Sequence, residues 1–282
     1  MTPPGIVPHV TFGKTGALVE RVSLGGEGVL RTHGRTREAA AVIEEAIASG
    51  VRYCDTAPAY DQSQDYYGSV FAASPGAREQ VFLASKTHER GRAGALALLE
   101  DSLRRLKTDR LDLWQMHDLC TAAELDEIFR PDGAIAAAEQ AKKEGRVRFV
   151  GLTGHHDPRI LLEAMRRHPF DAVLVPINAA DPARLPFTTT VIPAARERGM
   201  AVIGMKVMAQ GVILADRAAT PEECIRYAMA FADTLIIGCS SPAEVRENLH
   251  IGRTAAPMTA DEQRELETRL SRSARRYSYF KA

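Results

Sequence analysis

The chain has 282 residues, enough for one large domain, and 45% of them are hydrophobic, as in globular proteins. Its 36 Lys and Arg residues balance 36 Asp and Glu residues, so the overall charge favours neither nucleic acid nor an anionic membrane as a partner. No export signal is evident at the N-terminus and no stretch reaches the roughly 18 apolar residues that span a bilayer, so we expect an unexported, cytoplasmic protein.

Two short β-type runs come first along the chain. Val10–Phe12 and Ala17–Glu20 flank a Gly-Lys-Thr-Gly turn at Gly13–Gly16. This arrangement predicts a small β-hairpin, which we expect to plug the bottom of the structure that follows it.

From residue 21 onward, short β-type runs alternate with longer amphipathic stretches, which is the pattern of βα units around a parallel sheet. The clearest helix is predicted at Thr36–Ser49, where Ala40, Ile43 and Ile47 share one face and Gly50 follows as a stop. The predicted strands are Arg21–Leu24, Val51–Asp55, Val81–Lys86, Leu111–His117, Val147–Leu152, Ala172–Pro176, Ala201–Met205 and Thr234–Ile237.

Eight such units match a closed (β/α)8 barrel, for which about 250 residues is typical. An open doubly wound sheet is the alternative. However, the GGEG sequence at Gly25–Gly28 has neither the glycine spacing of a dinucleotide fingerprint nor a helix start after it. We interpret this cluster as a turn at the barrel mouth. The sequence therefore predicts an α/β protein, a (β/α)8 barrel with an N-terminal β-hairpin, with residues 1–282 as a single domain.

Three successive predicted strands end in ionisable side chains, namely Asp55, Lys86 and His117. Active sites of such barrels lie at the carboxyl ends of the strands, so we expect these side chains on one rim. The loop after Asp55 is short and leads to Tyr60. It can therefore return a phenol to the same place.

These four residue types suit proton transfer. A free tyrosine has a pKa of about 10, but a neighbouring ammonium favours the phenolate and lowers that pKa. Lys86 is the candidate ammonium, Asp55 can hold it in place and charged, and a neutral His117 can orient an incoming oxygen. Singly, a buried Lys–Asp pair is more often structural, and a lone His after a strand is often a core residue. The conjunction of all four favours catalysis.

The same segments resemble those of the aldo-keto reductase family. GVRYCDTAPAYDQSQDYYG at Gly50–Gly68 is similar to the family's Asp-and-Tyr signature, and LASKTH and LWQMHD match its next two signatures. The resemblance implies an oxidoreductase that transfers a hydride from NADPH or NADH to an aldehyde or ketone. It also implies that Tyr60 is the general acid, that Lys86 and Asp55 tune it, and that His117 positions the carbonyl group.

The resemblance further implies cofactor contacts at later strand ends. Thr153-Gly154 stands where the family usually has a Ser-Asn pair, so the hydroxyl is retained and the amide is lost. Leu174 replaces a common Gln, which leaves Asn178 as the nearest amide, and Met205 replaces a stacking Tyr. His155 is expected to face the substrate. The expected cofactor-binding residues are Gly25, Thr153, Gly154, Asn178, Met205, Lys206, Gly238, Cys239, Ser240, Glu244, Glu247 and Asn248.

The segment Gly238–Asn248 resembles the family's adenosine-binding turn and helix start. Ser240 or Ser241 is predicted to cap that helix, whose exposed N–H groups suit an anion. The two positions that usually carry basic residues toward a 2′-phosphate hold Gly238 and Glu244. The sequence therefore leaves both NADPH and NADH open.

Two other functions stay open at this point. The barrel could bind the dinucleotide and serve as a sensor or partner subunit, as some relatives of the family do. Alternatively, Lys86 could form a Schiff base in a lyase or hydrolase, although Asp55 opposes this because it keeps the lysine protonated.

The remaining expectations concern thiols and partners. Cys54, Cys120, Cys224 and Cys239 are far apart and form no CxxC pair, so we expect free thiols and no metal site. We expect a small carbonyl substrate, no nucleic-acid or membrane partner, and a monomer or small homo-oligomer. The tail at Arg275–Ala282 could cover the pocket, pack on a partner subunit or be disordered.

Overall fold

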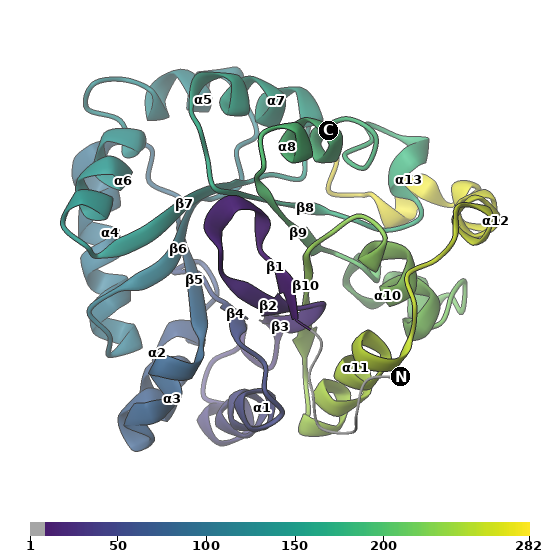
Figure 1. Ribbon diagram of the computed structural model, residues 1–282, viewed down its shortest axis with the longest axis horizontal. Helices are drawn as coiled ribbons and strands as arrows, with labels where there is room; N and C mark the ends of the chain where they lie inside the picture. Colours follow the sequence, from purple (N-terminus) through teal and green to yellow (C-terminus); the bar gives the residue numbers. More distant parts are fainter. Residues whose placement is uncertain (1–8) are drawn as a thin grey trace.

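The protein is a closed barrel of eight parallel strands surrounded by helices (Figure 1). The computed structural model describes residues 9–282, apart from the side chain of Pro75. Residues 1–8, which belong to the predicted single domain and to the segment examined for an export signal, lie outside the described residues. The predicted (β/α)8 barrel is confirmed. Its strands are β3 (Val22–Gly28), β4 (Tyr53–Asp55), β5 (Phe82–Thr87), β6 (Leu111–Met116), β7 (Val147–Thr153), β8 (Ala172–Pro176), β9 (Ala201–Met205) and β10 (Thr234–Cys239).

Helices follow the strands and cover the outside of the barrel (Figure 1). The helix predicted at Thr36–Ser49 is α1, and it ends at Ala48 because Gly50 takes a positive φ of 84° that favours glycine. The other helices are α2 (Ser63–Ala73), α3 (Pro75–Gln80), α4 (Arg92–Leu106), α5 (Ala122–Ile128), α6 (Ala134–Lys143), α7 (Pro158–Arg167), α8 (Val191–Glu197), α9 (Val212–Ala215), α10 (Pro221–Met229), α11 (Pro242–Thr254), α12 (Ala260–Ser271) and α13 (Ala274–Tyr277).

The predicted hairpin is present and plugs one end of the barrel. Strands β1 (His9–Thr11) and β2 (Leu18–Glu20) pair antiparallel and lie across the barrel axis in Figure 1. Phe12, directly after β1, is fully buried, and its ring centroid lies 5.5 Å from that of Tyr53 and 5.3 Å from that of Phe82. The hairpin therefore closes the inner core of the barrel from the side opposite the strands' carboxyl ends.

The glycine cluster after the first predicted strand is not a turn, as we had interpreted it, because β3 runs on through Gly25–Gly28. The structure gives the physical reason. A Cβ on Gly28 would lie 2.4 Å from the carbonyl oxygen of Cys239, and one on Gly25 would lie 3.0 Å from the backbone of Ile237. These glycines let β3 approach β10 closely where the barrel closes.

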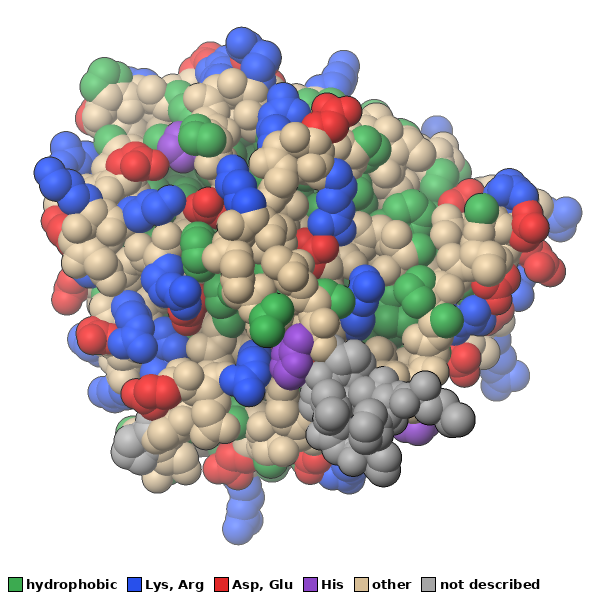
Figure 2. All heavy atoms as spheres, in the orientation of Figure 1, with side chains coloured by type: hydrophobic (Ala, Val, Ile, Leu, Met, Phe, Trp, Pro, Cys, Tyr) green, Lys and Arg blue, Asp and Glu red, His purple; other side chains and the backbone are tan. Residues whose placement is uncertain are grey.

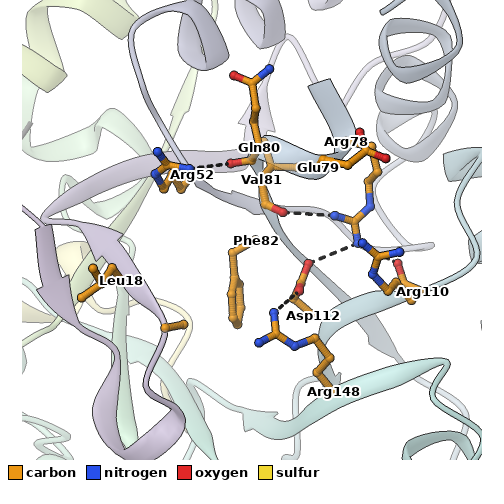
Figure 3. A pocket seen from close by; sticks show the side chains of 11 residues that line it. Leu18, Arg52, Arg78, Glu79, Gln80, Val81, Phe82, Arg110, Asp112 and Arg148 are labelled. Carbon is orange, nitrogen blue, oxygen red and sulfur yellow. Dashed lines mark hydrogen bonds and ion pairs between the residues drawn. The ribbon is translucent and has the colours of Figure 1, made fainter. Parts of the chain in front are cut away.

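An ion cluster beside the hairpin holds three strands together at the bottom of the barrel (Figure 3). Asp112 on β6 accepts hydrogen bonds from the backbone N–H of Leu83 on β5 at 2.9 Å and from Arg148 on β7 at 2.7 Å. Arg78 donates to the same carboxylate at 3.2 Å. The carboxylate is thus fully used by protein groups. We assign the cluster to stability, as is usual for this face of such barrels.

Acidic and basic side chains are interspersed over the face shown in Figure 2. This matches the balanced charge of the sequence. Within residues 9–282, none of the helices has both the length and the apolar character needed to cross a bilayer.

Candidate active site

The ionisable residues predicted at three strand ends lie at the same end of the barrel. Asp55 is the last residue of β4, Lys86 is the second-last residue of β5, and His117 follows β6 directly. The Nζ atom of Lys86 lies 2.6 Å from Oδ2 of Asp55, and both side chains are completely buried. Lys86 also donates a hydrogen bond to the backbone carbonyl of Thr56 at 3.0 Å. The lysine is thus fixed in one position.

Tyr60 returns to this pair from the loop after β4. Its ring centroid lies 4.7 Å from Nζ of Lys86 and 5.8 Å from the ring centroid of His117, which it meets edge to face. Gly26 makes room for the ring, because a Cβ at that position would lie 2.4 Å from it. The structure therefore brings the four predicted residues together.

Burial dominates the pKa values of this group. It raises the pKa of Asp55 and lowers that of Lys86, while the attraction between the two opposes both shifts. It also raises the pKa of Tyr60 well above its usual value, with help from the carboxylates of Asp55 and Glu27. The pKa of Tyr60 in the protein alone therefore shifts in the direction opposite to our expectation, because loss of water around the phenolate outweighs the nearby guanidinium of Arg31.

Burial, together with the charge of Lys86, lowers the pKa of His117 to about 3, so the imidazole is neutral at physiological pH.

This shift makes the stability of the protein depend on pH. In the unfolded chain the pKa of His117 is about 6.5, so the free energy of unfolding should fall as pH drops from 6.5 toward 3, by up to about 1.4 kcal/mol per pH unit. His117→Asn should flatten this part of the curve, measured by urea denaturation at a series of pH values. The exposed His250→Asn is the control, and equal slopes in both variants would contradict the expectation.

A cavity of about 1120 Å³ extends from these four residues across the carboxyl ends of the strands. Most of the predicted cofactor and substrate residues line it. They are Gly25, Thr153, His155, Met205, Lys206, Gly238, Ser240, Glu244, Glu247 and Asn248.

Three predicted cofactor residues do not line the cavity. The amide of Asn178 is used within the protein, since it donates to the carbonyl of Lys206 at 3.1 Å and accepts from the N–H of Ala180 at 3.0 Å. Gly154 is packed so closely that a Cβ would lie 2.9 Å from the carbonyl oxygen of Leu119. The buried thiol of Cys239 accepts a hydrogen bond from the side-chain amide of Asn248 at 3.5 Å. These contacts turn all three residues toward the protein rather than toward a ligand.

Sequence reasoning missed several charged groups of the cavity wall. Glu27 lies within the glycine cluster and pairs with Arg31 at 2.8 Å, and the guanidinium of Arg31 lies 5.3 Å from the ring centroid of Tyr60. Asp118 follows His117 and has an Oδ1 atom 3.1 Å from Nε2 of His155. The signal for Asp118 was its place directly after a strand-end histidine. No sequence signal marked Glu27 as a site residue, because its segment was interpreted as a turn.

The C-terminal tail packs beside the cavity. The ring of Phe280 meets that of His155 edge to face at 5.6 Å, and Nζ of Lys206 lies 5.1 Å from the same Phe280 ring. Lys281 is buried and pairs with Asp181. The tail is therefore ordered and packs against residues of the cavity wall, which differs from the disordered tail that the sequence left open.

The lining of the cavity has the chemistry that a nicotinamide dinucleotide requires. Leu174, Met205 and Ile236 provide an apolar surface for a flat ring, and Lys206 provides a cation nearby. At the far end, helix α11 begins with its N-cap Ser241, whose side chain accepts a hydrogen bond from the N–H of Glu244. The start of a long helix is a favourable place for the anionic groups of such a ligand.

The buried Lys86–Asp55 pair, with Tyr60 and His117 beside it, lies at the strands' carboxyl ends and opens onto a long cavity, which is where (β/α)8 barrels place their active sites. The chain belongs to the aldo-keto reductase family, whose sequence profile, described as "Aldo/keto reductase family", matches residues 22–222. Members of this family use NADPH or NADH.

Individual relatives agree with this assignment. The uncharacterized oxidoreductase YrpG of Bacillus subtilis is 28% identical over 233 residues, which are 73% of this chain and 68% of that protein. The aldo-keto reductase YhdN of the same organism is 34% identical over 51% of this chain and 46% of its own length. A 6-dehydroglucose reductase of Novosphingobium aromaticivorans is 29% identical over half of each chain. The chain thus spans about half the length of several curated relatives that it matches.

Solved structures show the same fold. The holo form of aldo-keto reductase AKR11C1 from Bacillus halodurans superposes with a TM-score of 0.78 at 22% identity, over 94% of this chain and 96% of that one. An aldo/keto reductase from Brucella melitensis gives a TM-score of 0.72 at 18% identity, over 94% of this chain and all of that one.

Proposed function

We propose that this protein reduces an aldehyde or ketone, with Tyr60 as the general acid. The observation that carries the proposal is the position of the Tyr60 ring, 4.7 Å from the Lys86 ammonium and 5.8 Å from the His117 ring, at one end of a cavity of about 1120 Å³. NADPH or NADH, when bound in this cavity, supplies the hydride.

Each of the four residues has its own role in the proposed delivery of a proton. Negative charge develops on the substrate oxygen as its carbon is reduced, and an alkoxide is a far stronger base than a phenolate. Tyr60 can therefore give up its proton even though burial raises its pKa. That raised pKa also keeps the phenol protonated before the reaction. The Lys86 ammonium then stabilises the phenolate that remains, and Asp55 holds the ammonium in place.

His117 orients the substrate oxygen. Its neutral imidazole carries one N–H, which can donate a hydrogen bond to a carbonyl oxygen directed at Tyr60. Arg90 fixes the backbone at this point, since its guanidinium donates to the carbonyl oxygens of His117 at 2.8 Å and of Asp118 at 3.0 Å. A well-held donor of this kind favours one orientation of the carbonyl group.

The proposed cofactor contacts come from the cavity wall. The hydroxyl of Thr153 accepts a hydrogen bond from the N–H of Asp118 at 2.9 Å, which leaves its proton for a carboxamide. Met205 can pack on the nicotinamide ring through its polarisable sulfur, and Lys206 can reach the diphosphate. Gly25, Gly238, Ser240, Glu244, Glu247 and Asn248 complete the proposed set.

A direct assay tests the proposal. Purified protein is mixed with NADH or NADPH and a panel of carbonyl compounds that begins with para-nitrobenzaldehyde, and loss of the reduced nicotinamide is followed by its near-ultraviolet absorbance. We expect consumption that depends on the carbonyl compound. Tight cofactor binding without turnover on any member of a broad panel would instead indicate a sensor or partner subunit.

Electrostatics at the start of α11 favours NADH over NADPH. The Glu244 carboxylate accepts a hydrogen bond from the N–H of Ser240 at 2.8 Å. It therefore occupies the place where the helix dipole would otherwise stabilise a 2′-phosphate. Arg246 does not compensate, because it pairs with Glu45 on α1 at 2.6 Å. The carboxylate should repel the extra phosphate.

Glu244→Gln should therefore raise kcat/KM for NADPH about tenfold, and that for NADH by much less, because it removes a negative charge from the part of the cavity proposed to hold the 2′-phosphate. Steady-state kinetics with both cofactors measures the ratio. Glu265→Gln, on the exposed face of α12, is the matched control. A wild-type preference for NADPH, unchanged in Glu244→Gln, would overturn the assignment.

All four cysteines are free thiols, which suits a reducing compartment, and we propose that the protein works in the cytoplasm. A monomer or small homo-oligomer stays a prediction, as does the absence of a nucleic-acid partner.

A further inference from the structure

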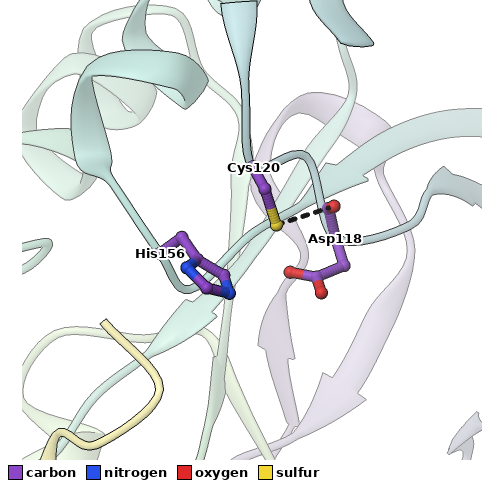
Figure 4. A group of neighbouring side chains, drawn as sticks. All are labelled: Asp118, Cys120 and His156. Carbon is purple, nitrogen blue, oxygen red and sulfur yellow. Dashed lines mark hydrogen bonds between the residues drawn. The ribbon is translucent and has the colours of Figure 1, made fainter. Parts of the chain in front are cut away.

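Three potential metal ligands of different chemistry meet on the loops that follow β6 and β7 (Figure 4). Asp118 offers a carboxylate oxygen, Cys120 a sulfur and His156 a ring nitrogen, and these atoms all lie within 4.8 Å of one another. The spacing of the cysteines led us to expect no metal site. That reasoning considered cysteine pairs alone and not a Cys that joins an Asp and a His from another loop.

The side chains of His156 and Cys120 are little used by the fold. Among residues 9–282, the imidazole of His156 makes no hydrogen bond or ion pair, and its only aromatic neighbour is His155, with ring centroids 5.1 Å apart. The thiol of Cys120 makes one weak contact, a donation to the backbone carbonyl of Asp118 at 3.3 Å. The polar atoms of His156 and Cys120 lie close to the Asp118 carboxylate, which is itself paired with His155, so the cluster points to a shared ligand.

The backbone around the cluster is firmly held. The N–H of Asp118 donates to the Thr153 hydroxyl at 2.9 Å, and the N–H of Cys120 donates to Glu124 at 2.9 Å. On the other loop, the carbonyl of His156 accepts from the N–H of Ala282 at 3.2 Å. Hydrogen bonds within the protein therefore hold the backbone of both loops in position.

A fourth potential donor lies next to the cluster. The Nε2 atom of His155 lies 3.1 Å from Oδ1 of Asp118, so both histidines face the same carboxylate. A set of one thiolate, one or two imidazoles and one carboxylate suits Zn²⁺, which binds such ligands at about 2.0 to 2.3 Å in tetrahedral geometry. The hard cations Mg²⁺ and Ca²⁺ prefer oxygen ligands, so a sulfur and a nitrogen disfavour them.

We propose that Asp118, Cys120 and His156 form a Zn²⁺ site on the wall of the catalytic cavity, with His155 or water as the fourth ligand. Binding forms a coordinate bond from the Cys120 sulfur to the metal, and the thiol proton leaves to solvent. Asp118 and Cys120 both line the cavity, and Asp118 directly follows His117. Occupancy therefore places a divalent cation beside the residue proposed to orient the substrate. This proposal does not depend on turnover.

Metal titration tests the site without reference to activity. Metal-free protein is titrated with Zn²⁺ in competition with a chromogenic zinc indicator, and with Co²⁺ as a spectroscopic substitute. We expect one equivalent of metal per chain. We also expect a near-ultraviolet cobalt–thiolate charge-transfer band and the visible bands of a tetrahedral cobalt centre.

Ligand variants make the result specific. Cys120→Ser should abolish the charge-transfer band, and both Cys120→Ser and His156→Ala should weaken zinc binding by at least the roughly tenfold that loss of a metal ligand's hydrogen-bonding partner costs. Cys224→Ser, at a buried thiol on α10, is the matched control and should keep both the band and the affinity. Circular dichroism confirms that each variant is folded. Zinc affinity unchanged in folded Cys120→Ser and His156→Ala, or absence of the band in the wild type, would overturn the proposal.

Discussion

Tyr60→Phe is expected to lower kcat/KM for carbonyl reduction by about 100-fold to 10,000-fold, the range that a positioned general acid usually contributes. The ring can keep its place beside Gly26 and Lys86, because only the hydroxyl is lost. The substrate oxygen must then take its proton from water. Dissociation constants for NADH and NADPH, from quenching of protein fluorescence, should change by no more than about twofold, since chemistry and not cofactor binding is impaired.

Tyr279→Phe is the matched control for this experiment. Tyr279 is half-exposed on the C-terminal tail, where its hydroxyl pairs with Gln210, and it lies outside the proposed machinery. We expect its kcat/KM to stay close to that of the wild type. Activity retained in Tyr60→Phe would rule out Tyr60 as the proton donor and would make His117 the next candidate for that role.

The position of the candidate site could be predicted from the sequence because strand ends are a simple signal. Asp55, Lys86 and His117 each follow an apolar run, and parallel strands in a barrel deliver their carboxyl ends to one rim. The short loop to Tyr60 limited how far the phenol could lie from them. The family resemblance added the roles. Both lines of reasoning depend on local sequence, which is why they agree on these residues.

The direction of the Tyr60 pKa shift could not be predicted in the same way. Sequence proximity shows which charges are near, but desolvation depends on how completely the surrounding chain excludes water. Glu27 reaches the site from β3, in the segment Gly25–Gly28 that we interpreted as a turn, and Arg31 reaches it from the loop after β3. Asn178 failed as a predicted ligand for a related reason. Its amide satisfies the backbone of its own loop, which a residue type alone does not reveal.

The cluster of Asp118, Cys120 and His156 illustrates the same limit. Its members lie on loops after two different strands, and these come together only because β6 and β7 are neighbours in the barrel. Spacing between cysteines is informative when ligands share one loop. It says nothing about a set built from an Asp, a Cys and a His on two loops.

Lys86→Met should destabilise the protein as well as inactivate it. Both members of the Lys86–Asp55 pair are completely buried and their charged atoms are 2.6 Å apart. Removing one partner of such a pair leaves an uncompensated charge and typically costs about 3 to 5 kcal/mol of unfolding free energy. The lone Asp55 carboxyl then has a pKa raised above its unfolded value. The loss should therefore be small at low pH, where the carboxyl is protonated, and grow as the pH rises.

A second variant separates the charge effect from packing. Asp55→Asn combined with Lys86→Met removes both charges, so most of the lost stability should return, whereas carbonyl reduction should stay abolished because Tyr60 still lacks its ammonium neighbour. Lys142→Met is the matched surface control. Its ion pair with Asp171 is 3.3 Å long and the lysine is 43% exposed, so we expect a change of less than about 1 kcal/mol. Urea denaturation of all four proteins at several pH values measures these differences. If the single Lys86→Met variant is as stable as the double one throughout, the buried pair does not carry the charge that the proposed mechanism requires.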